Sequence, residues 1–290
     1  MQWQLTRQHW RDYLQLMRLE KPIGTYLLLW PTWWALWIAA EGVPPLGILI
    51  VFTLGVILMR AAGCVINDFA DRKVDGAVAR TKNRPLAAKR VTSAEAIQLF
   101  VVLVLAAASL LIFLNWQTVL LSVVALALAI AYPFMKRYTH LPQLVLGAAF
   151  SWGMPMAFMA LQLQLPVIVW LLYGANLLWT VAYDTYYALV DKPDDLKTGI
   201  KSTAILFGKQ VFVIIGLLQL ATLVLLALVG YLAQLHWVYY LSLMAVAVCF
   251  GYQYLIAKKS LAGCFSAFLH NHYVGMLVFS GIALSYLLQG

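Results

Sequence analysis

Residues 63–90 read GCVINDFADRKVDGAVARTKNRPLAAKR, an apolar segment that ends in a dense run of charge. Three of the chain's 11 acidic residues, Asp68, Asp71 and Asp75, fall in this stretch, beside Asn67. If the arriving helix continues, Asn67, Asp71 and Asp75 share one of its faces, because four-residue spacing returns to the same side. Like charges at that spacing repel, so a cation should lie against them. Asparagine and carboxylate oxygens suit Mg²⁺, which completes its shell with water and phosphate oxygens, and we predict a magnesium site here.

The same stretch is rich in basic side chains, which suit a polyanionic partner. They are Arg72, Lys73, Arg80, Lys82 and Arg84. A solvated loop is the alternative interpretation of such a run of charges. The concentration of so few acids in one place favours a site over that alternative.

The composition is that of an integral membrane protein. Hydrophobic residues make up 63% of the 290 residues and charged residues only 11%, which leaves too little polar surface for a soluble globule. The net charge of +9 suits loops that face anionic lipid headgroups, and nucleic acid is not expected as a partner. The 3 cysteines show neither metal-ligand spacing nor an even count, so no zinc site or disulfide framework is indicated.

We predict an all-α bundle that crosses the membrane about nine times and forms a single domain over residues 1–290. Residues 1–21 are expected to form an amphipathic helix at the membrane interface, since aromatic and apolar residues lie opposite arginines. The predicted spans, each about 17–25 residues long and so able to cross the hydrocarbon core, are roughly 22–40, 45–67, 96–114, 117–134, 141–162, 166–190, 209–233, 236–257 and 272–289.

The distribution of Lys and Arg predicts the orientation of the chain. With nine spans, 19 of the 20 basic residues fall in the N-terminal segment or in loops on its side of the membrane. Because basic loops stay in the cytosol, the N-terminus is expected there. The loops 68–95 and 191–209 then both open on the cytosolic face and are the predicted active-site loops.

A second group of acids closes the span 166–190. Asp184, Tyr187, Asp191 and Asp195 fall on one helical stripe, although Pro193 is expected to end or restart the helix near Asp191. Asp184 lies inside the span, and an ionisable residue at membrane depth is a functional candidate. Two acidic groups that meet across a bundle could hold metal ions and one diphosphate between them. The alternative for Asp184 is a carboxylate satisfied by a neighbouring hydroxyl or amide.

Three basic residues near the membrane are further candidates. Arg60 lies inside a span, seven positions before Asn67 and therefore on the same helical face. Its guanidinium could bind a carboxylate or phosphate, or could extend to the membrane surface. Lys136 and Arg137 could form an anion clamp, although a purely topological role is the alternative.

These motifs resemble the intramembrane aromatic prenyltransferase superfamily. The similarity rests on N-D-x-x-D-x-x-x-D at residues 67–75, RTKNRPLA at 80–87 and D-x-x-x-D at 191–195. The sequence RLEKPIGTYLLLWPTWWAL at 18–36 is similar to one branch, the bacterial 4-hydroxybenzoate polyprenyltransferases of ubiquinone synthesis. The resemblance covers nearly the whole chain. It implies a multi-pass protein of the bacterial inner membrane, with its active site on the cytosolic side.

The resemblance also implies a reaction and a set of binding residues. A polyprenyl diphosphate would lose diphosphate to give an allylic cation, which the carbon ortho to the phenol of 4-hydroxybenzoate attacks. Mg²⁺ and diphosphate would be held by Asn67, Asp71, Asp75, Asp191 and Asp195. The departing diphosphate would be neutralised by Arg72, Lys73, Arg80 and Arg84.

The aromatic substrate leaves alternatives open. Asp184, Tyr187 or Asp191 could position or deprotonate the phenol, and Arg60 or Arg137 could bind the benzoate carboxylate. Another aromatic acceptor would keep the superfamily but change the branch.

Two other classes of protein are less consistent with the sequence. A divalent-cation transporter is expected to carry acids deep in several spans or inverted repeats, which are not found. A CDP-alcohol phosphotransferase begins its motif with D-G-x-x-A-R, as residues 75–80 do, but this chain has Lys89, Ser93 and Ile97 where that motif continues with Gly, Asp and Asp.

Overall fold

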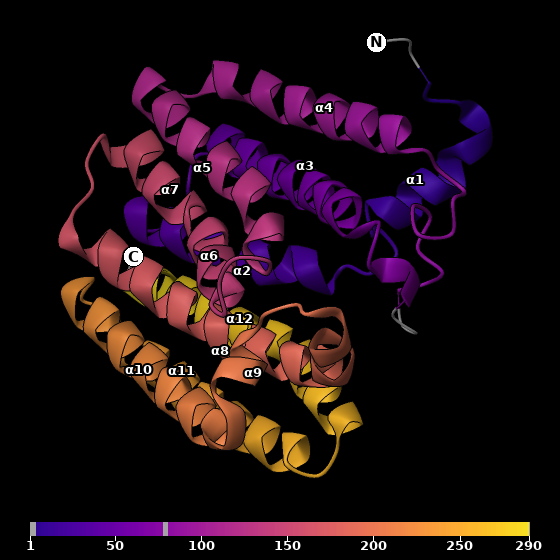
Figure 1. The fold of residues 1–290 in the computed structure, drawn as a ribbon. Helices are drawn as coiled ribbons and strands as arrows, with labels where there is room; N and C mark the ends of the chain where they lie inside the picture. Colours follow the sequence, from indigo (N-terminus) through magenta and orange to yellow (C-terminus); the bar gives the residue numbers. More distant parts are fainter. Residues whose placement is uncertain (1–3, 78–80, 290) are drawn as a thin grey trace.

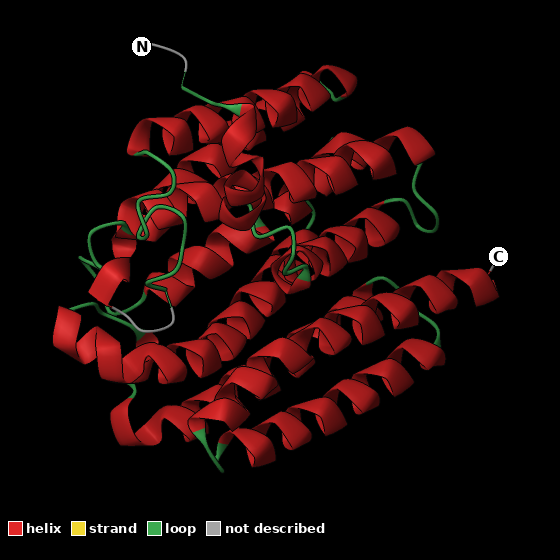
Figure 2. Cartoon of the chain, turned by 90° about the vertical axis from the view of Figure 1, so that its right-hand side faces the viewer, coloured by secondary structure: helices red, strands yellow, loops and turns green. Residues whose placement is uncertain are grey.

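The computed structural model describes residues 4–77 and 81–289, and every regular element within them is helical (Figure 1, Figure 2). The longer helices are α2 (Ile23–Ala39), α3 (Leu46–Asp71), α4 (Ser93–Ser109), α5 (Trp116–Met135), α8 (Val167–Thr198), α10 (Val211–Leu232), α11 (Trp237–Ala257) and α12 (Leu261–Gln289). The shorter ones are α1 (Trp10–Leu16), α6 (Pro142–Ser151), α7 (Gly153–Gln162), α9 (Thr203–Leu206) and the 3-10 turns η1 (Arg7–His9), η2 (Asp75–Ala77), η3 (Leu110–Phe113) and η4 (Gly208–Gln210).

The described part of the chain contains 8 stretches that are long and apolar enough to cross a membrane. Helix α2, with 17 residues, corresponds to the first predicted span and is slightly shorter than these. The multi-pass helical bundle expected from the sequence is thus confirmed, with a count close to the nine predicted.

Helix α8 runs through the middle of the molecule (Figure 1). It packs against α6 and α7 on one side and against α10 and α12 on the other, while α11 packs on α10 and α12. Helices α3, α4 and α5 form the other end of the bundle, and α1 lies against α3. This arrangement places the ends of α3 and α8, which carry the two acidic groups, across from each other.

Two buried tryptophans at the centre of the bundle, Trp34 and Trp179, have hydrogen-bonded indole nitrogens. The rings of Trp34 and Trp179 stack with their centroids 5.5 Å apart. Trp34 Nε1 donates to the carbonyl of Gly275 at 2.9 Å, and Trp179 Nε1 donates to Asn271 Oδ1 at 2.8 Å. Because both of these indole N–H groups have a partner, Trp34 and Trp179 can fill the core between α2, α8 and α12 without leaving their own polar atoms unsatisfied.

Helix α8 is longer than predicted, because Pro193 does not end it. The helix continues through Pro193 to Thr198, and the expected break near Asp191 is therefore wrong. It ends instead at Gly199, which has φ of +72° and donates its N–H to the carbonyl of Asp195. A glycine in the left-handed conformation is a common helix terminus, and here Gly199, rather than Pro193, ends the helix. Most of the predicted loop 191–209 is accordingly helical.

The boundaries of two further segments also differ from the prediction. Helix α12 begins at Leu261 and not near 272, because Ser260 Oγ accepts the N–H of Gly263 at 3.0 Å and caps the helix. The predicted span 141–162 is two helices, α6 and α7, which meet at Trp152. Pro155 has no N–H to continue a regular helical ladder across that junction.

The N-terminal segment is less helical than expected. Within residues 4–21, the described part of the predicted helix 1–21, the helical elements are η1 and the seven-residue α1. Arg18, at φ of +52°, follows the end of α1 and turns the chain toward α2.

Candidate active site

The first acidic group spans the end of α3 and the turn that follows it. Asn67, Asp68 and Asp71 lie in the last turns of α3, whereas Asp75 begins η2. The expectation that Asn67, Asp71 and Asp75 share one continuous helical face is therefore wrong, because α3 ends at Asp71. The chain turns there, with the N–H of Val74 donating to the carbonyl of Asp71 at 2.8 Å.

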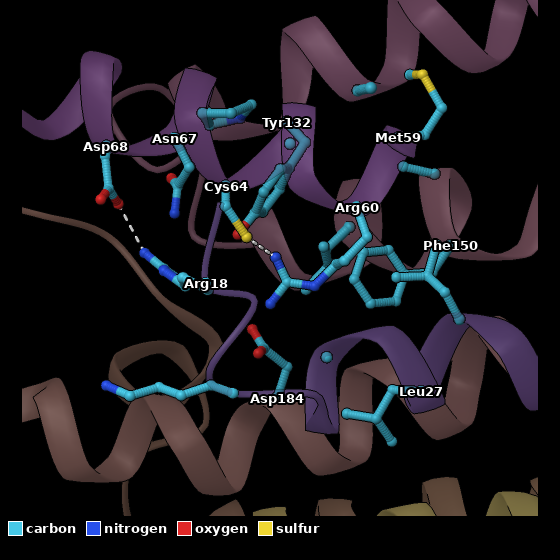
Figure 3. A pocket seen from close by; sticks show the side chains of 18 of the residues that line it. Arg18, Leu27, Met59, Arg60, Cys64, Asn67, Asp68, Tyr132, Phe150 and Asp184 are labelled. Atoms are coloured by element: carbon cyan, nitrogen blue, oxygen red, sulfur yellow. Dashed lines mark hydrogen bonds and ion pairs between the residues drawn. The ribbon is translucent and has the colours of Figure 1, made fainter. Parts of the chain in front are cut away.

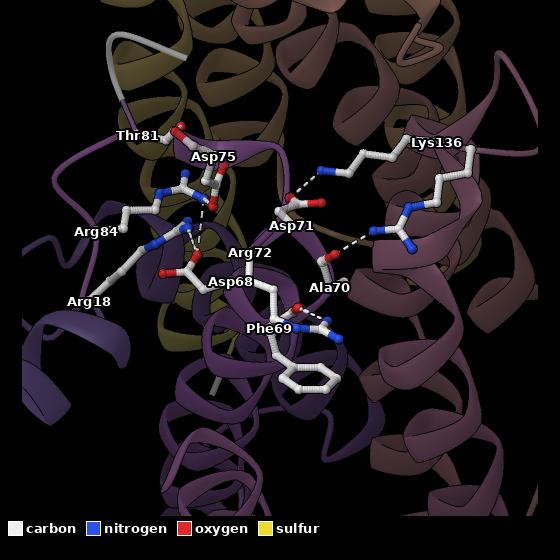
Figure 4. Close-up of polar contacts among 11 residues, drawn as sticks. Arg18, Asp68, Phe69, Ala70, Asp71, Arg72, Asp75, Thr81, Arg84 and Lys136 are labelled. Carbon is white, nitrogen blue, oxygen red and sulfur yellow. Dashed lines mark hydrogen bonds and ion pairs between the residues drawn. The ribbon is translucent and has the colours of Figure 1, made fainter. Parts of the chain in front are cut away.

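An alternating chain of acids and arginines links this group (Figure 4). Arg18 Nη2 donates to Asp68 Oδ1 at 2.6 Å, and Arg84 Nη1 donates to the same oxygen at 3.0 Å. Arg84 Nη1 also donates to Asp75 Oδ2 at 2.9 Å. Asp68 is only 1% exposed, so two guanidinium partners are what make its burial as a carboxylate tolerable.

The local charges shift the pKa of groups at the mouth of this site. Burial raises the pKa of Asp75, the neighbouring Asp71 and Asp68 raise it further, and Arg84 opposes them. Burial alone would lower the pKa of Arg18, but the adjacent Asp68 carboxylate more than reverses this and raises it. Nearby carboxylates thus raise both pKa values: they disfavour the ionised form of Asp75, which has the same charge, and favour the ionised form of Arg18, which has the opposite charge.

Asp71 is held from the opposite side of the cavity. Lys136, at the C-terminal end of α5, forms an ion pair with Asp71 Oδ2 (Figure 4). The other carboxylate oxygen, Asp71 Oδ1, is buried and has no hydrogen-bond partner among the described residues. A buried carboxylate oxygen without a partner is costly in free energy, which suits an atom that faces a cationic ligand.

A cavity of about 1100 Å³ brings the two acidic groups together. Helix α8 contributes Asp184, Tyr187, Asp191 and Asp195 to its wall, at the three- and four-residue spacing that keeps side chains on one face of an uninterrupted helix. The α3 side contributes Asn67, Asp68, Asp71 and Asp75. Residues more than a hundred positions apart in the chain therefore line one space, as two converging sites require.

The cavity continues away from the charges into an apolar channel. Its walls there come from η3, α5 and α6, including Leu111, Leu114, Ala125, Leu126 and Phe150. The lining side chains therefore change from charged at one end of the cavity to apolar at the other. Such a gradient matches an amphiphilic ligand with an anionic head and an apolar tail.

Arg60 lies inside the cavity and does not extend to the surface (Figure 3). Its guanidinium donates to Cys64 Sγ, one turn along α3, and faces Asp184 on α8. On its other side it lies against Gly24, where a Cβ atom would overlap the guanidinium. Cys64 and the bare backbone of Gly24 thus set the position of Arg60.

Three of the predicted cationic residues do not line the cavity. Arg72 Nη1 donates to the carbonyl of Phe69 at 2.6 Å, and its guanidinium stacks over the Phe69 ring. Arg137 donates to the carbonyl of Ala70, and Lys73 is exposed. Their predicted roles at the site have no support from this placement. Arg80 lies outside the described residues.

Several residues that do line the cavity were not among the predicted site residues. These include Arg18, Asp68, Tyr132 and Gln143, whereas Lys136, which also lines the cavity, was a candidate for an anion clamp. Arg18 belonged to the N-terminal signature and Lys136 to the basic pair after the span 117–134, so the sequence offered a reason to consider each of them as a site residue. Nothing in the sequence distinguished Lys136, which faces Asp71, from Arg137, which does not.

The acidic residues fit a metal that is shared with a ligand. Within residues 4–77 and 81–289, no group of three or more His, Cys, Asp or Glu side chains is close enough to enclose a metal ion. Mg²⁺ commonly takes only one or two carboxylates from the protein and the rest of its shell from water and phosphate. The unpartnered oxygen of Asp71 and the carboxylates of α8 across the cavity are donors of this kind.

Comparison with known proteins places this arrangement in a family. The model of the UbiA prenyltransferase family matches residues 28–286. A 4-hydroxybenzoate octaprenyltransferase of Escherichia fergusonii is 59% identical over 287 residues, which cover 99% of this chain and 99% of that protein.

Solved structures share the fold. A UbiA homologue from Aeropyrum pernix K1 superposes with a TM-score of 0.80 at 25% identity, over 90% of this chain and 98% of that one. A UbiA homologue from Archaeoglobus fulgidus, bound to DMAPP and Mg²⁺, has a TM-score of 0.70 at 19% identity, over 93% and 99% of the two chains. With its full-length relatives and this shared bundle, the chain belongs to the UbiA prenyltransferase family of membrane enzymes.

Proposed function

We propose that this enzyme transfers a polyprenyl group from a polyprenyl diphosphate to 4-hydroxybenzoate, at the ring carbon ortho to the phenol, in ubiquinone biosynthesis. The observation that carries the proposal is the 59% identity, over almost the whole chain, to a 4-hydroxybenzoate octaprenyltransferase. The cavity supports it, since one end is charged and the other apolar. Membership of a prenyltransferase family also favours group transfer over the transport and phosphotransfer alternatives.

The diphosphate is expected at the charged end, between the two acidic groups. Arg18, Arg84 and Lys136 line that end and would neutralise the charge that develops on the leaving group. Mg²⁺, held by Asn67, Asp71, Asp75, Asp191 and Asp195, would supply further electrostatic stabilisation of the departing diphosphate.

The prenyl tail is expected along the apolar channel. When the allylic C–O bond breaks, diphosphate takes the bonding electrons and leaves a carbocation that water would destroy. The apolar walls, including Leu111, Leu126 and Phe150, exclude water from this part of the cavity. Positioning the tail there keeps the cation next to the aromatic acceptor.

The acceptor is expected between Arg60 and α8. The Arg60 guanidinium, held by Cys64 and Gly24, would bind the benzoate carboxylate. Asp184, Tyr187 or Asp191 would orient the phenol on the opposite wall. The ring carbon forms the new C–C bond, and its proton passes to one of these groups as a base, which restores the aromatic ring.

We further propose that the protein lies in the bacterial inner membrane, with the charged end of the cavity on the cytosolic side. The basic residues support this orientation, since they gather on the side of the N-terminus and of the acidic groups.

The test is prenyl transfer in membranes from a host that lacks its own enzyme, with labelled 4-hydroxybenzoate and a polyprenyl diphosphate. We expect a lipid-soluble product that requires Mg²⁺, disappears with EDTA, and is lost in both Asp71→Asn and Asp191→Asn. Product from a different aromatic acid, with none from 4-hydroxybenzoate, would reject the branch and keep the family. Activity that survives both substitutions would reject a site shared by α3 and α8.

A further inference from the structure

The N-terminal segment, residues 4–21, is tied to the start of α4 through one buried carboxylate. Glu95 is 2% exposed and accepts hydrogen bonds from Tyr13 Oη at 2.5 Å and from His9 Nδ1 at 2.7 Å. It also accepts the N–H of Thr92 at 2.8 Å, as part of a capping box. Only the Thr92 interaction is needed to begin the helix, so the bonds to Tyr13 and His9 have another consequence.

A second tie joins the same two parts of the chain. Arg90 donates to Asp12 Oδ1 at 2.5 Å and to Gln15 Oε1 at 2.9 Å, both on the N-terminal segment. It also donates to the carbonyl of Asn83 at 2.9 Å. The N-terminal segment is therefore held against residues 83–95 on two sides of α1.

Each of the two segments that these bonds hold together supplies one arginine to the charged end of the cavity. Arg18 lies two residues after the end of α1, in a left-handed conformation that a non-glycine residue rarely adopts, and reaches Asp68. Arg84 comes from the segment to which α1 is tied, and it reaches the same oxygen of Asp68. Figure 4 shows the two arginines at Asp68. They come from the two segments that the bonds of Glu95 and Arg90 hold together.

We propose that the bonds of Tyr13 and His9 to Glu95 form a latch that positions Arg18 at the charged end of the cavity. In this proposal, which rests on the proposed function for its substrate, Tyr13 and Glu95 are positioning residues that act through Arg18 on the diphosphate. Release of the latch leaves α1 held through Arg90 and no longer through Glu95, loosens the contact of Arg18 with Asp68, and weakens binding of the diphosphate without affecting the aromatic acceptor.

Tyr13→Phe is the variant of choice, because the hydroxyl is not part of the capping box and the ring can keep its packing. The matched control is Tyr239→Phe, which removes a tyrosine hydroxyl that donates to the carbonyl of Leu226 at 2.9 Å, far from the cavity lining. In full-length protein in membranes, we expect Tyr13→Phe to raise KM for polyprenyl diphosphate roughly fivefold. KM for 4-hydroxybenzoate should stay unchanged, and the control should leave both constants unchanged.

A double-mutant cycle separates positioning from general stability. If Tyr13 acts through Arg18, Tyr13→Phe has no further effect on KM for the diphosphate in an Arg18→Gln background. Independent, multiplicative effects of the two substitutions would overturn the proposal. So would an equal rise in KM for both substrates.

Proteolysis tests the latch without any prenyl transfer. Arg7 and Arg11 are exposed, so trypsin can report on how tightly the segment is held. We expect Tyr13→Phe to speed cleavage at these sites at least threefold. Inorganic pyrophosphate with Mg²⁺ should slow cleavage of the wild type but not of Arg18→Gln.

Equal cleavage rates for Tyr13→Phe and the wild type would overturn the latch, whatever the acceptor is. If 4-hydroxybenzoate proved not to be the acceptor, the proteolysis result would still decide for or against the latch. Failure of the proposed function and failure of the latch are thus distinguishable.

Discussion

The spacing of Asp71 and Asp75 in the sequence is the same as that of Asp191 and Asp195, yet the backbone conformation differs between the two pairs. Asp191 and Asp195 lie one turn apart on α8, which continues to Thr198. Asp71 and Asp75 are separated by the end of α3, and Asp75 lies beside Asp68 through Arg84. The comparison shows that D-x-x-x-D does not specify one geometry: a helix positions one pair, while ion pairs position the other.

The largest effect is expected from testing the helical face of α8. Asp195→Asn should lower prenyl transfer by more than about 100-fold, because it removes a carboxylate that the proposal places on the metal and diphosphate. The adjacent Asp194→Asn should change the rate by less than about threefold. Asp194 also lines the cavity, but its side chain is one-third exposed (33%) and its carboxylate pairs with Lys197 at 3.4 Å, so the proposal gives it no place on the metal. Equal losses of prenyl transfer in the two variants would show that the position of a carboxylate around α8 does not affect the reaction.

The ion-pair network at the end of α3 is expected to contribute to stability as well as to the site. Arg84→Gln should lower the free energy of unfolding by roughly 2–3 kcal/mol, because it removes a charged partner from Asp68, which is 1% exposed, and from Asp75, which is 7% exposed. Thermal unfolding in detergent, with and without Mg²⁺ and pyrophosphate, would measure the change.

The matched control for Arg84→Gln is Lys197→Gln on α8. Lys197 is 76% exposed at its side chain, and surface ion pairs contribute little, so its loss should be within about 0.5 kcal/mol. A similar loss of stability in both variants would contradict the view that cations organise only the α3 group.

Arg60 faces Asp184 inside the cavity, and Gly24 makes room for it (Figure 3). In Gly24→Ala the new methyl group would displace the flexible Arg60 guanidinium from its place beside Cys64. We expect KM for 4-hydroxybenzoate to rise roughly tenfold, with a smaller change for the diphosphate. Gly47→Ala is the control, since nothing lies within 4 Å of a Cβ there. Unchanged kinetics in Gly24→Ala would remove Arg60 from the acceptor site.

The smallest effect is expected at the end of α8. Gly199→Ala should cost about 1 kcal/mol of stability, because a Cβ is unfavourable at φ of +72°. Pro193→Ala should be neutral or slightly stabilising, because the chain already follows a helix there. The reverse ranking in thermal unfolding would mean that Pro193, and not Gly199, determines the end of α8.

Most of the fold could be predicted from hydropathy and charge, whereas the ends of helices could not. The predicted spans correspond to helices of the structure because each must contain enough apolar residues to cross a membrane. The errors, at Asp71, Pro193 and Ser260, depend on single hydrogen bonds or one backbone conformation. Competing local signals there have similar energies, so packing decides between them.

The candidate site was predictable in part, and its anionic side better than its cationic side. Asn67, Asp71, Asp75, Asp191 and Asp195 all line the cavity, as expected for acids that are rare in such a chain. Basic residues are common in cytosolic loops for topological reasons, so their presence in a loop does not show which of them face the cavity. Among the described loop cations, Arg84 lines the cavity, whereas Arg72 and Lys73 do not.

The sequence by itself determined the class of the protein, the approximate spans and the acids of the site, because composition and spacing are local properties. Only the tertiary structure decided which cations face those acids. Arg18 meets Asp68 across 50 residues and Lys136 meets Asp71 across 65. Arg72, directly after Asp71, turns away to Phe69 because α3 ends there. Whether a charge reaches a cavity depends on where helices end and what packs beside them, and these are properties of the folded chain.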